Sequence, residues 1–245
     1  MVIRIFDNQD EAGLYAASLA ERAIMGAAHP VLGLATGSTV IPFYRELVRL
    51  VQCGLDLSHI TTINLDEYIG LPPHHEQSYH AFMKRHLFSR VNIPESQVFI
   101  PDGSVPDLAA ECGRYDEIIR EYPIDLQILG IGVNGHIGFN EPDDLLVSRT
   151  HVVELSEETI RSNSRFFADV SEVPTRAITM GVQAILQARQ IVLMAFGEEK
   201  AHIVAKAIRG EVRTDIPASI LQLHRDVIFV LDKGSAKELS LAKDA

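Results

Sequence analysis

Residues 128–142 read Ile-Leu-Gly-Ile-Gly-Val-Asn-Gly-His-Ile-Gly-Phe-Asn-Glu-Pro. An apolar run stops here at a turn that carries His136 and Glu141. Glycines at 130, 132, 135 and 138 allow positive φ and let another group pack close to the backbone. Ligands of open α/β sheets bind outside the carboxyl ends of the strands. The stretch is therefore either a loop that builds a site or a glycine-rich turn with a structural histidine.

Short apolar runs alternate with helical patterns along the whole chain. The runs that predict strands are 2–6, 31–35, 60–65, 97–100, 125–130, 177–180, 191–196 and 227–231. The patterns that predict helices are 8–28, 40–52, 78–88, 106–121, 157–167, 181–188, 198–209 and 234–241. Continuous apolar strands alternating with helices are typical of a parallel sheet covered on both faces. We therefore predict an α/β fold with a mostly parallel sheet and helices on both faces.

The domain organisation follows from the lack of any linker, repeat or low-complexity segment. Residues 1–245 are expected to form one domain. The stretch 141–156 fits neither a helix nor a strand, and irregular stretches of that length are often functional. It forms either a mobile lid, together with the helix that follows, or an irregular loop.

Composition excludes several classes of partner. The formal net charge is −11, whereas nucleic acids and anionic membranes require a basic surface. A small anion is still possible, because a few local donors can outweigh a distant background of charge. The two cysteines, Cys53 and Cys112, are far apart, which fits a reducing compartment. No run of about 18 apolar residues is present, so we expect a cytoplasmic protein without a membrane span.

A second candidate loop carries the sequence Ala-Thr-Gly-Ser-Thr at residues 35–39, between a strand and a helix. Backbone N–H groups at a helix N-terminus, together with the hydroxyls, can bind an anion. The residues expected to bind the anion are Thr36, Gly37, Ser38 and Thr39. The loop matches neither a Walker A motif nor a dinucleotide fingerprint. It is either an anion site or an ordinary Ser/Thr helix cap.

A third loop begins with Asp66 and Glu67 at the end of a strand. Adjacent residues of an extended segment point to opposite sides, so only one of the two is expected to face a crevice. A carboxylate there could abstract a proton if its pKa were tuned. The alternative is a solvated turn.

Two cations are candidates for holding an anion. Lys200 lies in the first turn of a helix, where the helix dipole disfavours a cation, unless Glu198 and Glu199 compensate it. Arg165 is suited to bidentate phosphate binding or, alternatively, to a surface salt bridge. The histidines His80 and His86 are six residues apart and do not share a helix face, so no metal site is expected.

Five segments together resemble the glucosamine-6-phosphate deaminase family. They occur in order and with similar spacing between about residues 30 and 232. The five segments are Ala-Thr-Gly-Ser-Thr (35–39), Asn-Leu-Asp-Glu-Tyr-Ile-Gly-Leu (64–71), residues 130–142, Asn-Ser-Arg-Phe-Phe (163–167) and Ser-Ile-Leu-Gln-Leu-His (219–224). The segments 64–71 and 130–142 are the ones specific to the family.

The resemblance implies a Rossmann-like single domain that converts glucosamine 6-phosphate and water to fructose 6-phosphate and ammonia without a cofactor. By position, Asp66 corresponds to the base that moves a proton between C2 and C1. His136 corresponds to the catalyst of ring opening, supported by Glu141. The phosphate and sugar site corresponds to Thr36–Thr39, Arg165 and Lys200, and a lid to about 151–180.

Two departures from the family pattern lead to further expectations. Asn134 replaces an aspartate of well-known members, and we expect its carbonyl to accept from the ring of His136 in the same orienting role. Allosteric members carry basic residues just after the segment matching 148–150, whereas this chain has His151 and Val153 and ends early. We therefore expect no activation by N-acetylglucosamine 6-phosphate, and a monomer or small homo-oligomer rather than a hexamer.

Two other functions are compatible with the sequence. A 6-phosphogluconolactonase shares the fold class but would not need Asp66 as a base. A sugar-phosphate-sensing domain of a transcription regulator could use the same phosphate pocket. That function predicts an attached helix-turn-helix and a basic face, which this sequence does not show.

Overall fold

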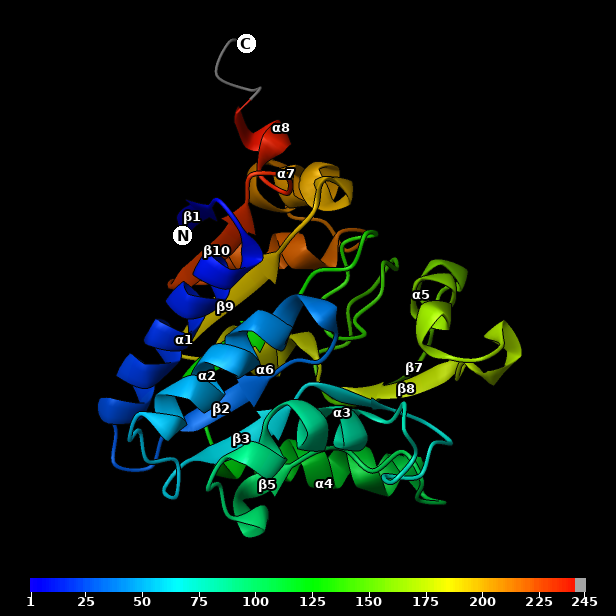
Figure 1. Cartoon of the computed structure of the whole chain (residues 1–245). Coiled ribbons are helices and arrows are strands. Elements are labelled where there is room, and N and C mark those ends of the chain that lie inside the picture. Colours follow the sequence, from blue (N-terminus) through cyan, green and yellow to red (C-terminus); the bar gives the residue numbers. More distant parts are fainter. Residues whose placement is uncertain (241–245) are drawn as a thin grey trace.

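A computed structural model describes residues 1–240 and contains a seven-stranded sheet in which every pair of neighbours is parallel (Figure 1). The strand order is β1-β10-β9-β6-β2-β3-β5. The strands are β1 (Val2–Phe6), β2 (Val31–Leu34), β3 (Thr61–Asn64), β5 (Val98–Phe99), β6 (Leu126–Leu129), β9 (Gln190–Ala195) and β10 (Val227–Asp232). The predicted α/β class is confirmed.

The helices flank this sheet, with α1 and α2 side by side over one face and α6 behind it in the view of Figure 1. The α1–α2 contact is close because Gly13 packs directly against Pro42. The α-helices are α1 (Gln9–Met25), α2 (Ile41–Gln52), α3 (Tyr79–His86), α4 (Leu108–Glu121), α5 (Glu157–Asn163), α6 (Val182–Gln187), α7 (Ala201–Arg209) and α8 (Lys237–Ser240). No helix in this range is long and apolar enough to cross a membrane.

Some predicted helices are shorter in the structure. The helix predicted over 157–167 ends at Asn163 and continues as the 3₁₀ turn η4 (Ser164–Phe166). The helix predicted over 234–241 begins only at Lys237, and residue 241 lies outside the described residues, as do 242–245 of the expected domain. The other 3₁₀ turns are η1 (Ser38–Val40), η2 (Phe88–Arg90), η3 (Glu95–Gln97), η5 (Val170–Glu172), η6 (Glu198–Lys200) and η7 (Pro217–Leu223).

A second, antiparallel sheet was not predicted. It consists of β4 (Asp66–Tyr68), β8 (Arg176–Thr179) and β7 (His151–Glu154), in the order β4-β8-β7. The strand predicted over 177–180 was expected in the parallel sheet but belongs to this small one. Strand β7 falls within 141–156, the stretch that could not be assigned. Its half-exposed residues carry no continuous apolar run, so pairing with β8 decides its conformation.

The two sheets meet at Leu65. Its backbone N–H donates to Leu34 O in the large sheet at 3.0 Å, and its carbonyl accepts from Met180 N beside the small sheet at 2.7 Å. The side chain is buried. The chain therefore passes from the large sheet to the small one through a single anchored residue.

The strand order places a topological switch point between β2 and β6. From β2 the chain continues outward through β3 and β5, whereas β6 is followed on its other side by β9 and β10. Crevices for ligands form at the carboxyl ends of strands at such a point. The loops after β2, β3, β6 and β9 are therefore placed to share one site.

Candidate active site

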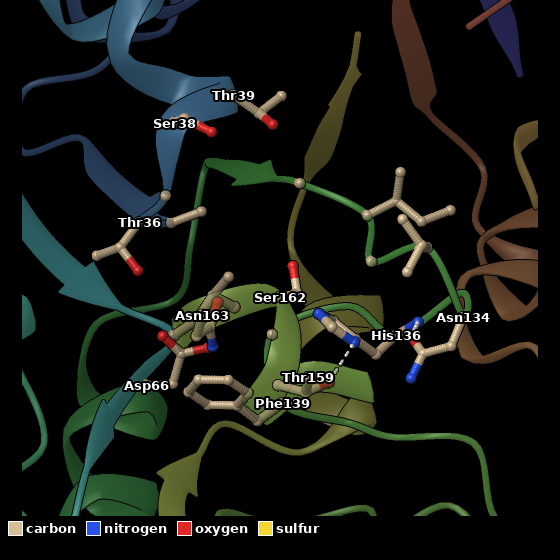
Figure 2. A pocket seen from close by; sticks show the side chains of 18 of the residues that line it. Thr36, Ser38, Thr39, Asp66, Asn134, His136, Phe139, Thr159, Ser162 and Asn163 are labelled. Atoms are coloured by element: carbon tan, nitrogen blue, oxygen red, sulfur yellow. Dashed lines mark hydrogen bonds between the residues drawn. The ribbon is translucent and has the colours of Figure 1, made fainter. Parts of the chain in front are cut away.

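One pocket lies at the carboxyl ends of these four strands, and residues of α5 and η4 complete its lining. Figure 2 shows Thr159, Ser162 and Asn163 of α5 beside Asp66 and His136. Nine of the ten predicted site residues line it, and Glu141 lies just behind. Those nine are Thr36, Gly37, Ser38, Thr39, Asp66, Asn134, His136, Arg165 and Lys200. The prediction that the separate loops converge on one crevice is confirmed.

The loop after β2 forms one wall of the pocket. Gly37 has a φ of 97° and directly precedes η1, which runs on into α2. A side chain at this position would be strained, so glycine suits the turn. Within residues 1–240, no side chain caps η1 by a hydrogen bond, so the simple Ser/Thr cap is not what the loop forms. The first backbone N–H groups of η1 thus border the pocket.

Two cations lie around this loop. Arg165 donates from Nη2 to Ser38 Oγ at 3.3 Å. Lys200 ends η6 and donates from Nζ to Ile131 O at 2.9 Å. Burial lowers the pKa of Lys200 to about 8, against the nearby charge of Glu199, which raises it. A buried ammonium with a lowered pKa that lines a pocket is suited to binding an anion.

Asp66 forms the floor of the pocket and is only 5% exposed. Burial, and next the charge of Glu67, raise the pKa of Asp66 well above its usual value. The alternative of a solvated turn is wrong. A buried carboxyl with a raised pKa is suited to proton transfer near neutral pH.

Glu67 points away from Asp66, as the alternation of an extended segment predicted. Its carboxylate accepts from the backbone N–H groups of Tyr79 at 2.9 Å and His80 at 3.0 Å, and lies 2.8 Å from His80 Nδ1. It thereby fixes the start of α3 and places Tyr79 in the pocket wall. His86 packs against Phe82 instead, and no metal-ligating cluster of three occurs among the side chains described.

His136 projects into the pocket from the loop after β6 (Figure 2). A Cβ at Gly132 would lie 2.3 Å from Cε1 of the imidazole, so only glycine leaves room for the ring. The predicted positive φ occurs at Gly135 and Gly138, but not at 130 or 132. The glycines of this loop thus serve two needs, namely the turn and the close approach of the ring.

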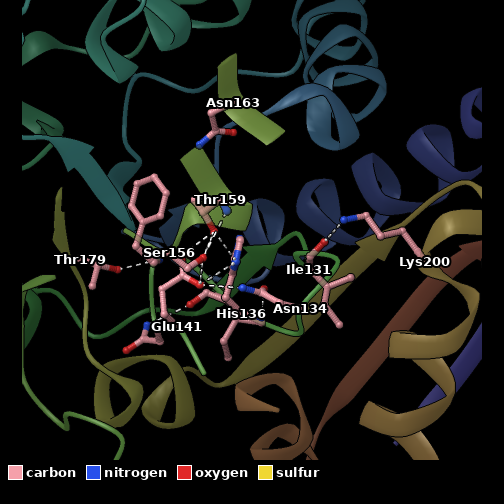
Figure 3. A network of polar contacts seen from close by, with 12 residues as sticks. Ile131, Asn134, His136, Glu141, Ser156, Thr159, Asn163, Thr179 and Lys200 are labelled. Atoms are coloured by element: carbon pink, nitrogen blue, oxygen red, sulfur yellow. Dashed lines mark hydrogen bonds and ion pairs between the residues drawn. The ribbon is translucent and has the colours of Figure 1, made fainter. Parts of the chain in front are cut away.

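Glu141 lies behind His136, with its Oε2 3.5 Å from Nδ1 of the ring (Figure 3). Burial alone would raise the pKa of Glu141. The interaction with His136 and hydrogen bonds from Thr159 and Asn134 outweigh it, and together they lower the pKa to about 2. The carboxylate is therefore ionised throughout the neutral range and stabilises a protonated imidazole.

Asn134 does not contact the ring as expected. Its carbonyl accepts from the backbone N–H of His136 at 3.2 Å, and its amide nitrogen donates to Glu141 Oε2 at 2.8 Å. The expectation that the carbonyl accepts from the ring is wrong, because the loop turns the amide toward the carboxylate. Asn134 supports His136 through Glu141.

We expect Asn134→Asp to shift the acid limb of the pH–rate profile to higher pH and to lower Tm at pH 7. The added charge beside Glu141 favours the protonated imidazole, while the lost donor and the carboxylate–carboxylate contact cost about 1–3 kcal/mol. Asn134→Ala is the matched control, since it removes the donor without adding charge. An unchanged profile in Asn134→Asp would contradict this expectation.

Several pocket residues were missed because they are neutral or come from the unassigned region. Thr159 and Ser156 contact Glu141, and Asn163 donates to Tyr68 Oη at 2.8 Å. The only signal was a pair of hydroxyl residues, Ser156 and Thr159, at a predicted helix start, which is also ordinary capping chemistry. Thr159 and Asn163 line the pocket, as do Tyr79, Phe139, Glu158 and Ser162.

Similarity to known proteins shows which family the chain belongs to. The family model for glucosamine-6-phosphate isomerases/6-phosphogluconolactonase matches residues 8–230. The chain belongs to this family. Similar curated members are the glucosamine-6-phosphate deaminases of Streptococcus uberis, 50% identical over 238 residues (97% of this chain, 99% of that one), and Thermoanaerobacter sp., 48% identical over 238 residues (96% and 94%).

Solved structures of the family agree with the fold. A monomeric glucosamine-6-phosphate deaminase is 42% identical, with a TM-score of 0.95 over 97% of this chain and 100% of that one. A 6-phosphogluconolactonase from Leishmania guyanensis is 21% identical, with a TM-score of 0.79 over 96% and 97%. The second similarity shows the shared fold alone.

Proposed function

We propose that the protein converts glucosamine 6-phosphate and water to fructose 6-phosphate and ammonia. One observation carries the proposal: a single pocket brings together a buried carboxyl of raised pKa, a histidine backed by an ionised carboxylate, and two cations beside a helix start. The relatives at 48–50% identity, which are deaminases, support the same substrate.

The phosphate occupies the end of the pocket built by the loop after β2. Backbone N–H groups at 37–39 and the hydroxyls of this loop donate to its oxygens, and Arg165 and Lys200 supply positive charge. This contact anchors the sugar at C6. The reacting carbons C1 and C2 are thereby held toward Asp66 and His136.

His136 opens the pyranose ring by moving a proton between O1 and O5. The ionised Glu141 behind it stabilises the imidazolium that forms during this transfer. Asp66 then takes the proton from C2, which gives an enolamine with a C1–C2 double bond, and returns that proton to C1. A proton of the amine passes to O1, so the product of this step is the C2 imine of fructose 6-phosphate. Water adds to C2 and ammonia leaves, giving fructose 6-phosphate.

The alternative lactone hydrolysis is less well supported. It requires attack of water on an ester carbonyl but no transfer of a carbon-bound proton, so a buried carboxyl of raised pKa has no role in it. The lactonase structures also stand at about half the identity of the deaminase structure, 21% against 42%. A sensor domain would need the cations but not the pair of Asp66 and His136.

The decisive assay offers the purified protein glucosamine 6-phosphate and, separately, 6-phosphogluconolactone. We expect ammonia and fructose 6-phosphate to form in equal amounts from the first, and no acceleration of hydrolysis of the second. Glucosamine without phosphate is the matched control for the anchor. Lactone hydrolysis without ammonia release would replace the proposal by the lactonase function.

We further propose that the enzyme is not activated by N-acetylglucosamine 6-phosphate. His151 and Val153 lie in β7, where allosteric relatives are expected to carry basic residues. We expect a hyperbolic rate curve whose KM increases when the compound is added, because its phosphate competes for the same loop. A fall in KM would contradict this.

Two features of the molecule as a whole belong to the same proposal. The segment between β7 and β8 forms the lid, within the expected 151–180, and the support for this is that residues of its α5 and η4 line the pocket. The protein is a monomer or small homo-oligomer, in keeping with the similar structure of a monomeric deaminase.

A further inference from the structure

Glu141 is the centre of a hydrogen-bond network that joins two separate segments, the loop after β6 and the start of α5 (Figure 3). Asn134 comes from the same loop as Glu141, whereas Ser156 and Thr159 come from the start of α5. Thr159 Oγ1 donates to Glu141 Oε1 at 2.5 Å, and Ser156 Oγ lies within hydrogen-bond distance of both Glu141 Oε2 at 3.2 Å and Thr159 Oγ1 at 3.1 Å. Thr159 is only 3% exposed. The proposed lid thus contributes to the environment of the carboxylate behind His136.

The direction of these bonds determines where His136 carries its proton. A hydroxyl has one proton, and the 2.5 Å contact is typical of donation to a carboxylate. The Thr159 oxygen, 3.4 Å from His136 Nδ1, can then only accept from the ring. Glu141 Oε2, 3.5 Å from the same nitrogen, also only accepts. Both oxygens favour the tautomer with hydrogen on Nδ1, which leaves Nε2 free to take a proton from the sugar.

The segment formed by α5 and η4 also contacts the loop after β2, at residues 35–39, which is the proposed phosphate loop. Ser156 caps α5 by accepting from Thr159 N at 3.2 Å, so the start of the helix is fixed locally. Just beyond the end of α5, Arg165 donates to Ser38 Oγ. One short, continuous segment therefore contacts the phosphate loop at one end and the support of His136 at the other.

We propose that Thr159 is a positioning residue for His136, and that α5 thereby couples phosphate capture to ring opening. When phosphate holds Arg165 against the loop at Ser38, α5 stays docked and Thr159 completes the oxygen pair facing Nδ1. When α5 moves away, Glu141 loses the Thr159 donor and its contact with Ser156, and the imidazole loses one acceptor. The step served by His136 rests on the proposed function, but the control of its tautomer does not.

The test compares Thr159→Val, which keeps the shape but removes the hydroxyl, with Thr159→Ser, which keeps the hydroxyl. Ser164→Ala is a matched control in the same segment, since that hydroxyl donates to Arg161 O. Nitrogen-15 NMR of His136 in the presence of inorganic phosphate reports the tautomer. We expect the Nδ1–H form in wild type, Thr159→Ser and Ser164→Ala, and a mixture of tautomers in Thr159→Val.

Kinetics give the second measurement. We expect Thr159→Val to lower kcat about 10- to 100-fold, as for loss of a hydrogen bond to a charged group. KM and the affinity for an open-chain 2-amino-2-deoxyhexitol 6-phosphate, which needs no ring opening, should change less than about threefold. Thr159→Ser should restore most of kcat.

The two measurements separate the possible failures. An unchanged tautomer in Thr159→Val overturns the positioning role, whatever the activity. Equal losses in Thr159→Val and Thr159→Ser overturn it as well, because the hydroxyl would then not be the cause. If wild type releases no ammonia, the proposed function fails, and the NMR comparison still decides the role of Thr159.

Discussion

Asp66→Asn is expected to lower the rate of ammonia release by about 10²- to 10⁴-fold, the usual contribution of a positioned general base. The amide has nearly the same shape as the carboxyl but cannot accept and return the proton of C2. Ring opening by His136 and phosphate binding do not use Asp66. We therefore expect KM to stay within about threefold of wild type.

The same substitution should leave Tm at neutral pH equal or higher. Because burial raises the pKa of Asp66, its ionised form is the unfavourable one in the folded state. A carboxyl with a raised pKa destabilises the fold at pH values above its unfolded pKa, and a neutral amide removes that penalty. Such an exchange of stability for activity is typical of catalytic groups.

Thermal unfolding and ammonia assays on the same preparation check both statements. Fructose 6-phosphate binding serves as the control that the pocket is intact. Wild-type activity in Asp66→Asn would refute its role as the base. A large fall in Tm would show that Asp66 holds the floor of the pocket together.

Removal of the Lys200 ammonium is expected to weaken sugar-phosphate binding by about 10- to 100-fold in Lys200→Ala, because a charge-assisted contact is lost. In wild type the affinity for the sugar phosphate should also fall as the pH rises. The pKa of Lys200 is about 8 in the ligand-free protein, so the ammonium is present below pH 8 and is lost above it. Each further pH unit should then raise Kd about tenfold.

Fructose 6-phosphate is the probe for this experiment, since it carries no amine that titrates in the same range. Calorimetric titrations between pH 7 and 9.5 give Kd for wild type and Lys200→Arg. Arginine stays charged over this range, so its Kd should be flat. A parallel rise of Kd in both proteins would show that another group causes the pH dependence.

The large sheet could be predicted because its strands are continuous apolar runs that are buried on both faces. β2 and the first five residues of β10 are examples, since their burial on both faces leaves no alternation with polar residues. The small sheet could not be predicted. β7 and β4 are three or four residues long and contain charged residues, so their conformation follows from pairing with β8 and from no local pattern.

The charged part of the site was predictable for a related reason. Asp66 and His136 stand out because each follows an apolar strand, where an ionisable side chain needs an explanation. The neutral part was not. Ser156 does cap α5, so its second contact with Glu141 is hidden behind ordinary capping. Asn134 has both a donor and an acceptor, and only the folded loop decides which one meets the carboxylate.

Leu65 joins the two sheets, and its neighbour Asp66 is the first residue of β4. One backbone group of Leu65 bonds to Leu34 and the other to Met180, so the residue belongs to both sheets at once. Asp66 therefore follows a residue whose N–H and C=O groups are both held, and its own backbone pairs with Thr179 in the small sheet. Moving the proposed base would require breaking hydrogen bonds on the side of both sheets, so its position is set by the junction between them.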